Sequence, residues 1–313
     1  MLRFTPLLLH TDGLRLKAEC LQPGGSYKIR GVRRFFERKI TCPGGLELLR
    51  GGVSTVSAGN LGRSLAAEAQ SLGIPCTIFV PDSAPFNKKQ KILSYGAVLE
   101  ERPFAEIFRM VHLAPLEPNF LHPLRTPELL EGYGEIAHEV LAEHPETEVI
   151  VAPFGLGGLA LGIARALQEK NSSATVVAAE LDLCAPLGAA LSAGGPVKIE
   201  RISSFVDAIG TAEVLPNVFE EAKDLLAGSI SVSIGETRQA LLELQLRQNL
   251  RVEGASAVAL AAGKKLARLS PGSKIVVILS GANIDLEVFE RETHAARLGL
   301  SDEHSPSALP TPL

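Results

Sequence analysis

The chain has 313 residues, of which 46% are hydrophobic and 21% charged, and its formal net charge is −4. This composition favours a folded protein over a disordered chain, and the slightly negative charge disfavours a nucleic-acid partner. No apolar run approaches the roughly 20 residues that a membrane-spanning helix needs, and the early Pro6 and Asp12 disfavour a signal peptide.

The four cysteines and seven histidines show no paired or metal-ligand spacing. Scattered, unpaired cysteines are typical of a reducing compartment and disfavour a disulfide framework or a zinc site. We therefore expect a cytoplasmic protein with no metal site and no membrane association.

The first candidate for chemistry in chain order is Lys28, in the segment Gly24–Gly31. A Gly-Gly turn leads there into an apolar pattern of helical spacing that begins at Ile29. Such a junction can aim a lysine into a cleft, where partial desolvation lets it form a Schiff base with a carbonyl. Most lysines are instead solvated surface charges. The neighbouring Tyr27 offers either a packing ring or an aromatic wall for a planar cofactor.

A loop of small polar residues follows the predicted strand Val53–Val56 and precedes a predicted helix that ends before Gly73. In one interpretation, a side chain of this loop caps the helix. In the other, the loop's N–H groups and a serine hydroxyl receive a substrate carboxylate, while its asparagine hydrogen-bonds a ring hydroxyl. The loop consists of Ser57, Ala58, Gly59 and Asn60.

A glycine-rich loop follows the predicted strand Val149–Ala152 and opens a predicted helix that ends at Glu169. Backbone N–H groups at such a helix start bind phosphate, although glycine here can also serve only close packing. A dinucleotide site would need an acidic residue at the end of the next strand, and Glu180 keeps that alternative open. The loop consists of Gly155, Leu156, Gly157, Gly158 and Leu159.

Further short, apolar segments alternate with helical patterns along the chain, which predicts an α/β fold with mainly parallel sheets. Ser280 follows the last of these strands, at the carboxyl edge where α/β sheets bind ligands, and is otherwise an ordinary turn serine. The proline-containing stretch Arg102–Thr126 is expected to be a mobile connection and the tail after Leu300 to be frayed. The other predicted strands are Thr77–Val80, Thr175–Ala179 and Lys274–Leu279, and the other predicted helices are Pro127–Glu143, Glu236–Gln248 and Ala255–Leu269.

Taken in order, these segments resemble the threonine/serine dehydratase and serine racemase group of fold-type-II pyridoxal-phosphate (PLP) enzymes. The resemblance runs from about residue 5 to about residue 290, nearly the whole chain. The segment Glu131–Ile136 lies where the family has a glycine-rich helix start. The matching segments are Thr5–Leu8, Leu16–Glu19, Leu21–Gly31, Ser57–Asn60, Glu131–Ile136, Gly155–Leu159, Glu253–Ala255 and Ser280–Asn283.

The resemblance implies a fold like that of the tryptophan synthase β-subunit, with two open α/β domains, mainly parallel sheets and the cofactor in the cleft between them. Residues 1–50 and 132–313 would form the large PLP-binding domain, and residues 51–131 a small substrate-gating domain. The resemblance also implies a homodimer.

In the resembled family, Lys28 would hold pyridoxal 5'-phosphate as a Schiff base and remove the substrate's α-proton. The phosphate would bind Gly155–Leu159. The ring would contact Tyr27, Asn60 and Ser280, and the amino-acid substrate would contact Ser57, Ala58, Gly59, Asn60 and Glu253. The expected enzyme is a dehydratase (ammonia-lyase) that converts a β-hydroxy amino acid such as L-threonine or L-serine to a 2-oxo acid and ammonia.

Three departures from the family pattern bear on this expectation. Leu156 replaces a usual glycine of the phosphate loop, although its backbone N–H remains. Ala58 replaces the serine that racemases use as a second acid/base, which disfavours racemisation. Pro186 replaces an aspartate of the family's divalent-cation site, whose other ligands match Glu180 and the carbonyl of Cys184, which disfavours that site.

Alternatives remain within and beyond this expectation. The same residues suit an amino-acid racemase, or another β-eliminating or β-replacing PLP lyase or synthase. In a different class, the chain would be a non-catalytic small-molecule binder on the same scaffold. Absorbance of a PLP–lysine adduct separates PLP binding from dinucleotide binding, and turnover of amino acids separates an enzyme from a binder.

Overall fold

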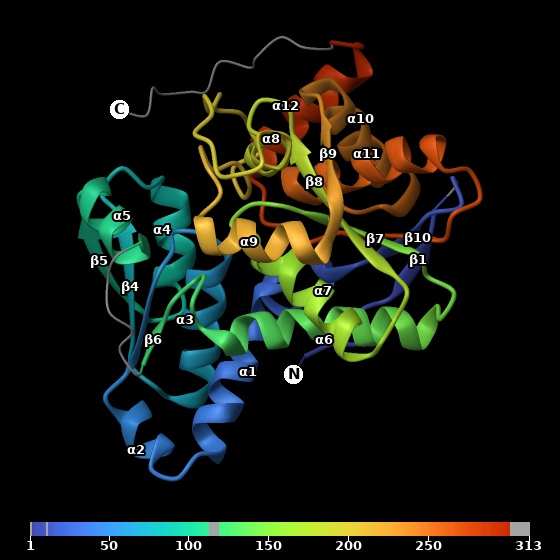
Figure 1. The fold of residues 1–313 in the computed structure, drawn as a ribbon. Coiled ribbons are helices and arrows are strands. Elements are labelled where there is room, and N and C mark those ends of the chain that lie inside the picture. Colours follow the sequence, from blue (N-terminus) through green and yellow to red (C-terminus); the bar gives the residue numbers. More distant parts are fainter. Residues whose placement is uncertain (1, 11, 113–118, 301–313) are drawn as a thin grey trace. The chain divides into compact units, whose positions relative to one another are not determined.

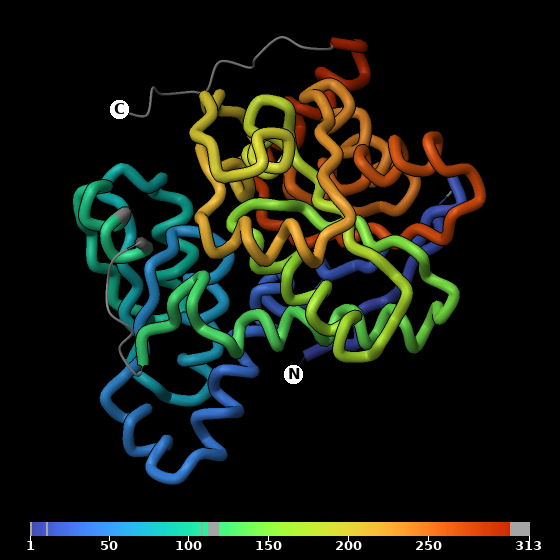
Figure 2. The backbone as a smooth tube through the Cα atoms, in the orientation of Figure 1, coloured from blue at the N-terminus to red at the C-terminus, as the bar shows by residue number. Residues whose placement is uncertain are grey.

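The computed structural model describes residues 2–10, 12–112 and 119–300. The chain divides into two compact units. Figure 2 shows the course of the backbone through both. The first contains Ser26–Tyr133 and the second contains Arg3–Gly25 with residues 134–300. In this division, residues 26–50 belong to the first unit, whereas the sequence-based expectation grouped them with residues 132–313. The assignment of residues 1–50 and 132–313 as the cofactor-binding domain stays a prediction.

The second unit is built on a six-stranded sheet of order β1-β2-β10-β7-β8-β9, in which only β1 and β2 pair antiparallel. In Figure 1, α7 and α9 lie on one side of this sheet and α10, α11 and α12 on the other. Strands covered on both faces need apolar residues throughout, and β10 is accordingly buried along its length. The strands are β1 (Leu7–Leu9), β2 (Arg15–Lys17), β7 (Val149–Pro153), β8 (Thr175–Leu181), β9 (Leu226–Val232) and β10 (Ile275–Ile278).

The first unit is built on a four-stranded, fully parallel sheet of order β5-β4-β3-β6. Helix α3 packs against β3, β4 and α1, and α5 packs against β3 and β4. The strands are β3 (Val53–Val56), β4 (Cys76–Pro81), β5 (Val98–Arg102) and β6 (Phe120–Leu121). The helices are α1 (Lys28–Thr41), α2 (Gly45–Arg50), α3 (Asn60–Leu72), α4 (Phe86–Leu93), α5 (Phe104–His112) and the start of α6 (Pro127–Glu143).

Helix ends in the second unit follow local sequence signals. Helix α10 begins at a capping box, in which the Ser233 side chain accepts from the Glu236 N–H and the Glu236 carboxylate accepts from the Ser233 N–H. Helix α8 places Pro186 in its first turn, where a missing N–H costs nothing. The helices after α6 are α7 (Gly158–Glu169), α8 (Pro186–Ala193), α9 (Pro216–Leu225), α10 (Ile234–Gln248), α11 (Gly254–Leu269) and α12 (Leu286–Arg297).

Two sequence-based expectations are wrong in detail. The stretch Arg102–Thr126, expected to be a mobile connection, contains α5 and β6, and its residues 113–118 lie outside the described residues. The segment Glu131–Ile136, placed at a helix start, lies inside α6, whose first residue is Pro127. The tail after Leu300 also lies outside the described residues. Among the residues that are described, no helix is both long and apolar enough to cross a membrane.

Candidate active site

Lys28 is the first residue of α1, and Tyr27 occupies the N-cap position without a side-chain cap. Two 3-10 turns, Glu19–Leu21 and Pro23–Gly25, separate this helix from β2. The junction is therefore a turn-to-helix junction and does not follow a strand directly. Gly24 and Gly25 adopt φ angles of 77° and 72°, which side-chain-bearing residues rarely adopt.

The Lys28 side chain is half-buried against two aromatic rings of the first unit. Its Nζ lies 4.6 Å from the centroid of the Tyr27 ring and 5.1 Å from that of the Tyr133 ring. The two rings make an edge-to-face pair with centroids 4.7 Å apart and an interplanar angle of 70°. The sequence predicted an aromatic neighbour in Tyr27. It marked the segment Glu131–Ile136, which contains Tyr133, but assigned Tyr133 itself no role.

The loop Ser57–Asn60 joins β3 to α3, as expected. Gly59 is the N-cap of α3 and has no side chain to cap it, so neither Ser57 nor Asn60 occupies the N-cap position. The Ser57 Oγ instead accepts a hydrogen bond of 3.2 Å from the Gly59 N–H. A helix N-terminus favours a nearby anion, which is compatible with the carboxylate-binding interpretation of this loop.

In the second unit, the loop Gly155–Leu159 joins β7 to α7. Gly157 is the N-cap of α7 at φ 88°, and no side chain caps the helix. A Cβ at Gly157 would lie 2.7 Å from Val218 Cγ1, so both conformation and space require glycine there. Leu156, the residue that departs from the family pattern, is 40% exposed, so part of its side chain faces solvent. The loop thus keeps a geometry that suits phosphate binding.

Ser280 and Glu253, both predicted as site residues, lie together in the second unit. The Ser280 side chain is buried, with its Oγ 3.4 Å from Ser256 Oγ and 3.5 Å from Glu253 Oε1. Ser256, which the sequence did not single out, donates to the Gly281 carbonyl and accepts from the Gly281 N–H. Glu253 is the N-cap of α11, so the cluster is held between that helix start and the loop after β10.

The loop after Ser280 is tied to the turn that precedes Lys28. Ala282 N–H donates to the Gly25 carbonyl at 2.9 Å, and Asn283 Nδ2 donates to the Gly24 carbonyl at 2.9 Å. Residues far apart in the sequence, Gly24–Gly25 and Ala282–Asn283, therefore lie side by side in the second unit. Sequence reasoning marked both segments but not their contact.

Glu180 has a structural role inside the second unit. Its buried carboxylate accepts hydrogen bonds from the Leu187 and Gly188 N–H groups at 2.8 and 2.9 Å and from Ser229 Oγ at 2.5 Å. Burial raises the pKa of this carboxyl, and the hydrogen bonds partly oppose the rise. The carboxylate thus caps the N-terminus of α8. The first residue of this helix is Pro186, which replaces an aspartate of the divalent-cation site in the resembled family.

One group of potential metal ligands exists among the described residues, formed by His10, Asp12 and Glu243, whose ligand atoms lie within 4.8 Å of one another. The ammonium group of Lys264 forms ion pairs with both carboxylates of this group, at 3.6 Å to Asp12 and closer to Glu243. Arg247 Nε also lies 3.2 Å from Glu243, so two cations already face the two carboxylates. The expectation of no metal site stays a prediction.

Comparison with known proteins places these features in a family. The sequence model described as "Pyridoxal-phosphate dependent enzyme" matches residues 2–281. The chain belongs to this family. It is accordingly a PLP-dependent enzyme with a mainly parallel α/β fold, as the resemblance implied, and the dinucleotide-binding alternative is wrong.

Individual PLP-dependent relatives cover most of the chain. An L-threonine ammonia-lyase of Geobacter sulfurreducens is 35% identical over 277 residues, 87% of this chain and 67% of the relative. A serine racemase of Rattus norvegicus is 32% identical over 87% of this chain and 84% of the relative. The processed threonine deaminase isoform 2 of Solanum lycopersicum shares the fold, with a TM-score of 0.82, 24% identity and coverage of 94% and 88% of the two chains.

Proposed function

We propose that the protein is a PLP-dependent ammonia-lyase (dehydratase) that converts a β-hydroxy amino acid such as L-threonine or L-serine to a 2-oxo acid and ammonia. The observation that carries the proposal is the pair of hydrogen bonds that ties the turn before Lys28 to the loop after Ser280. It brings together two segments that the dehydratase resemblance assigns to one cofactor. The L-threonine ammonia-lyases among the relatives support the reaction class.

The observed surroundings of the predicted residues fit PLP. Lys28 supplies a half-buried primary amine for the Schiff base, and the Tyr27 and Tyr133 rings lie beside it. The uncapped loop Gly155–Leu159 supplies N–H groups for the phosphate. Tyr27, Asn60 and Ser280 are proposed to contact the ring.

The residues of the chain have separate tasks in this proposal. When bound, PLP supplies a ring that takes up negative charge from the substrate's α-carbon. Lys28 removes the α-proton on its own face and later regains its covalent link. The loop Ser57–Asn60 is proposed to hold the substrate carboxylate, and Glu253, which lies 3.5 Å from Ser280 Oγ, is proposed to contact the substrate.

A racemase is the second candidate, because a serine racemase is among the relatives. Racemisation needs one proton carrier on each face of the α-carbon, and Ala58 has no exchangeable proton at the position where family racemases use serine. This residue favours elimination. The cytoplasmic location, the homodimer and the division into cofactor-binding and substrate-gating domains stay part of the proposal.

Attachment of the cofactor to Lys28 is testable by chemical trapping. Reduction of the purified protein with sodium borohydride, followed by peptide mapping, should place a pyridoxyl group on Lys28. The variant Lys28→Arg keeps the charge but cannot form a Schiff base, so it should lose the adduct, whereas Lys170→Arg at an exposed position should retain it. An adduct on a different lysine would contradict the assignment.

A further inference from the structure

Tyr133 is an unexplained polar residue beside the candidate lysine. Its side chain is 0% exposed, and its hydroxyl has no hydrogen-bond partner among the described residues. A buried tyrosine normally finds a partner for its hydroxyl, so the position of this ring needs another explanation. The face of that ring lies against Lys28 Nζ.

Close backbone packing between α1 and α6 fixes the position of Tyr133. A Cβ at Gly31 would lie 2.7 Å from Leu129 Cα, and a Cβ at Gly132 would lie 2.6 Å from the Arg30 carbonyl oxygen. Only glycines allow the two helices to approach this closely. Because Gly132 directly precedes Tyr133, this approach places the Tyr133 ring next to the first turn of α1.

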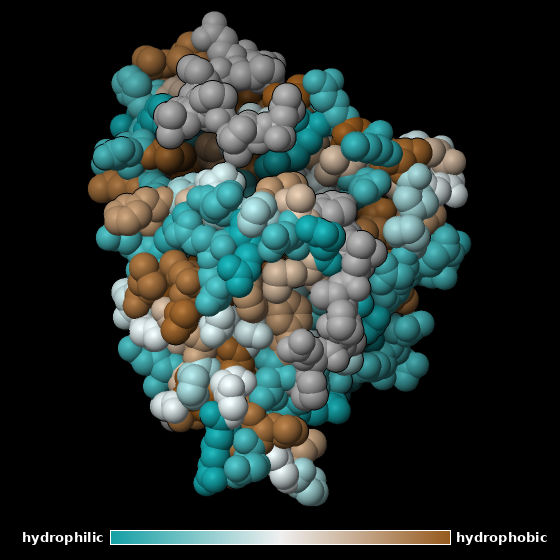
Figure 3. All heavy atoms as spheres, turned by 90° about the vertical axis from the view of Figure 1, so that its left-hand side faces the viewer, coloured by the Kyte–Doolittle hydropathy of each residue, from teal (hydrophilic) through white to brown (hydrophobic). Residues whose placement is uncertain are grey.

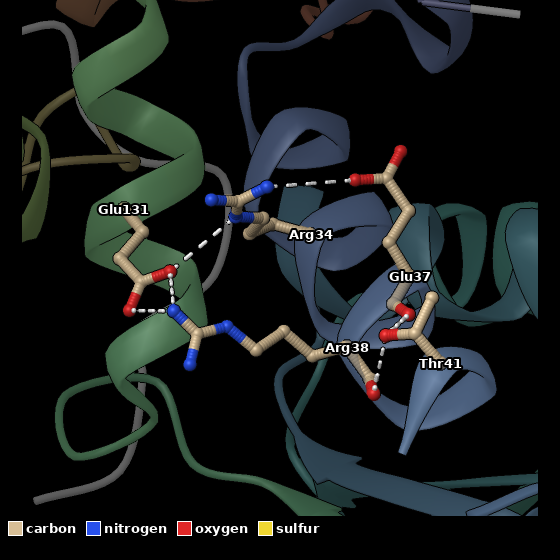
Figure 4. A network of polar contacts seen from close by, with 5 residues as sticks. All are labelled: Arg34, Glu37, Arg38, Thr41 and Glu131. Atoms are coloured by element: carbon tan, nitrogen blue, oxygen red, sulfur yellow. Dashed lines mark hydrogen bonds and ion pairs between the residues drawn. The ribbon is translucent and has the colours of Figure 1, made fainter.

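An ion-pair network on the exposed side of the same helix pair adds a second connection. Figure 4 shows Glu131 of α6 receiving hydrogen bonds from two arginines of α1. Arg38 Nη2 lies 2.9 and 2.7 Å from the two carboxylate oxygens, and Arg34 Nε lies 3.3 Å from one of them. Exposed pairs of this kind add little stability, but they join α6 to α1 at a second place.

We propose that Tyr27 and Tyr133 form an aromatic clamp that holds the Lys28 nitrogen and stabilises its positive charge. Both centroid distances fall within the roughly 6 Å range of cation–π attraction. The two rings stand at 70° to each other and both contact the nitrogen, so together they define one position for it. This reduces the rotamer freedom of the Lys28 side chain before it reacts. Tyr133 is thereby a positioning residue, and this inference rests on the proposed role of Lys28.

The charge state of Tyr133 bears on how its ring acts. The titratable groups that contact the nitrogen include the phenols of Tyr27 and Tyr133. Burial, with a smaller contribution from Tyr27, raises the pKa of the Tyr133 phenol well above its ordinary value. Tyr133 therefore stays neutral in the range where PLP enzymes are assayed, and its effect on Lys28 comes from the ring quadrupole.

The clamp is tested by replacing Tyr133 with phenylalanine and, by site-specific incorporation, with pentafluorophenylalanine. Both keep the ring, but fluorination removes its negative face. The midpoint pH at which the PLP–Lys28 absorbance band changes should stay with Tyr133→Phe. With the fluorinated ring it should fall by roughly 0.4 to 1.5 pH units, the range of cation–π energies converted at about 1.36 kcal/mol per unit. The same fluorinated residue in place of Tyr95, the tyrosine after α4, should leave the midpoint unchanged.

Two outcomes would overturn the clamp. One is an unchanged midpoint with the fluorinated ring, and the other is a fall of equal size with Tyr133→Phe, which would assign the effect to the hydroxyl. If borohydride trapping fails to mark Lys28, the proposed function is wrong. The clamp is then still measured by the pH dependence of Lys28 acetylation in the cofactor-free protein, with the exposed Lys170 as an internal reference.

Discussion

Single side chains decide which reaction the proposed site supports, and Ala58 is the clearest case. In the proposed mechanism, Lys28 supplies one proton carrier, on one face of the substrate's α-carbon. The methyl group of Ala58 supplies none at the position where a racemase of this family has serine. With a single carrier, an intermediate that has lost its α-proton either regains it on the same face or loses its β-hydroxyl.

Restoring a hydroxyl should therefore shift the partition toward racemisation. We expect Ala58→Ser to raise D-serine formation from L-serine relative to pyruvate formation, by at most about 10²–10⁴-fold if the hydroxyl is well positioned. Ala58→Gly changes the same position without an exchangeable proton and should leave the ratio unchanged. Equal ratios in the serine and glycine variants would show that this position does not control the outcome. Chiral chromatography of the reaction products measures both.

At the scale of elements, sequence patterns located the segments that join strands to helices but not every strand. The predicted bounds of β3 and α6 agree with the structure because a buried β-branched run and a clear helical period define them. The strand β5 was missed because it is half-exposed and carries charged residues, and β9 because its glycine and serines lack a strand pattern.

The loop between β7 and α7 offers a test at this scale, because Leu156 is exposed and the test needs a side chain there. Leu156→Glu places a negative charge beside the proposed phosphate position, whereas Leu156→Gln has nearly the same shape without the charge. We expect the glutamate variant to bind PLP more weakly by several-fold or more and the glutamine variant to differ little, since anions at a helix N-terminus repel each other. Fluorescence or absorbance titration with PLP gives both dissociation constants. Equal constants would exclude this loop as the phosphate site.

At the scale of the whole molecule, the order of motifs was readable from the sequence and their contacts were not. The motif order predicted the family, the cofactor and the α/β class. The contact of Tyr133 with Lys28, and that of Asn283 with Gly24, join residues far apart in the chain, and no local pattern encodes them. Such contacts arise from helix packing and loop geometry, so only the fold reveals them.

The surface of the molecule does not identify where the expected homodimer would form its contact. On the face in Figure 3, the hydrophobic side chains of the described residues lie in several separate clusters among hydrophilic ones. Scattered apolar side chains are normal for a protein surface and do not define an interface. The expected homodimer therefore stays a prediction without an assigned contact surface.

The central claim is that this PLP enzyme eliminates water from a β-hydroxy amino acid. The most direct test incubates the purified, PLP-loaded protein with L-threonine and with L-serine, and follows the 2-oxo acid and the D-amino acid in the same reaction. The account predicts 2-oxo acid and ammonia in equal amounts, with D-amino acid forming much more slowly, and no 2-oxo acid from the Lys28→Arg variant. D-serine forming as fast as pyruvate, or no 2-oxo acid from either substrate, would contradict it.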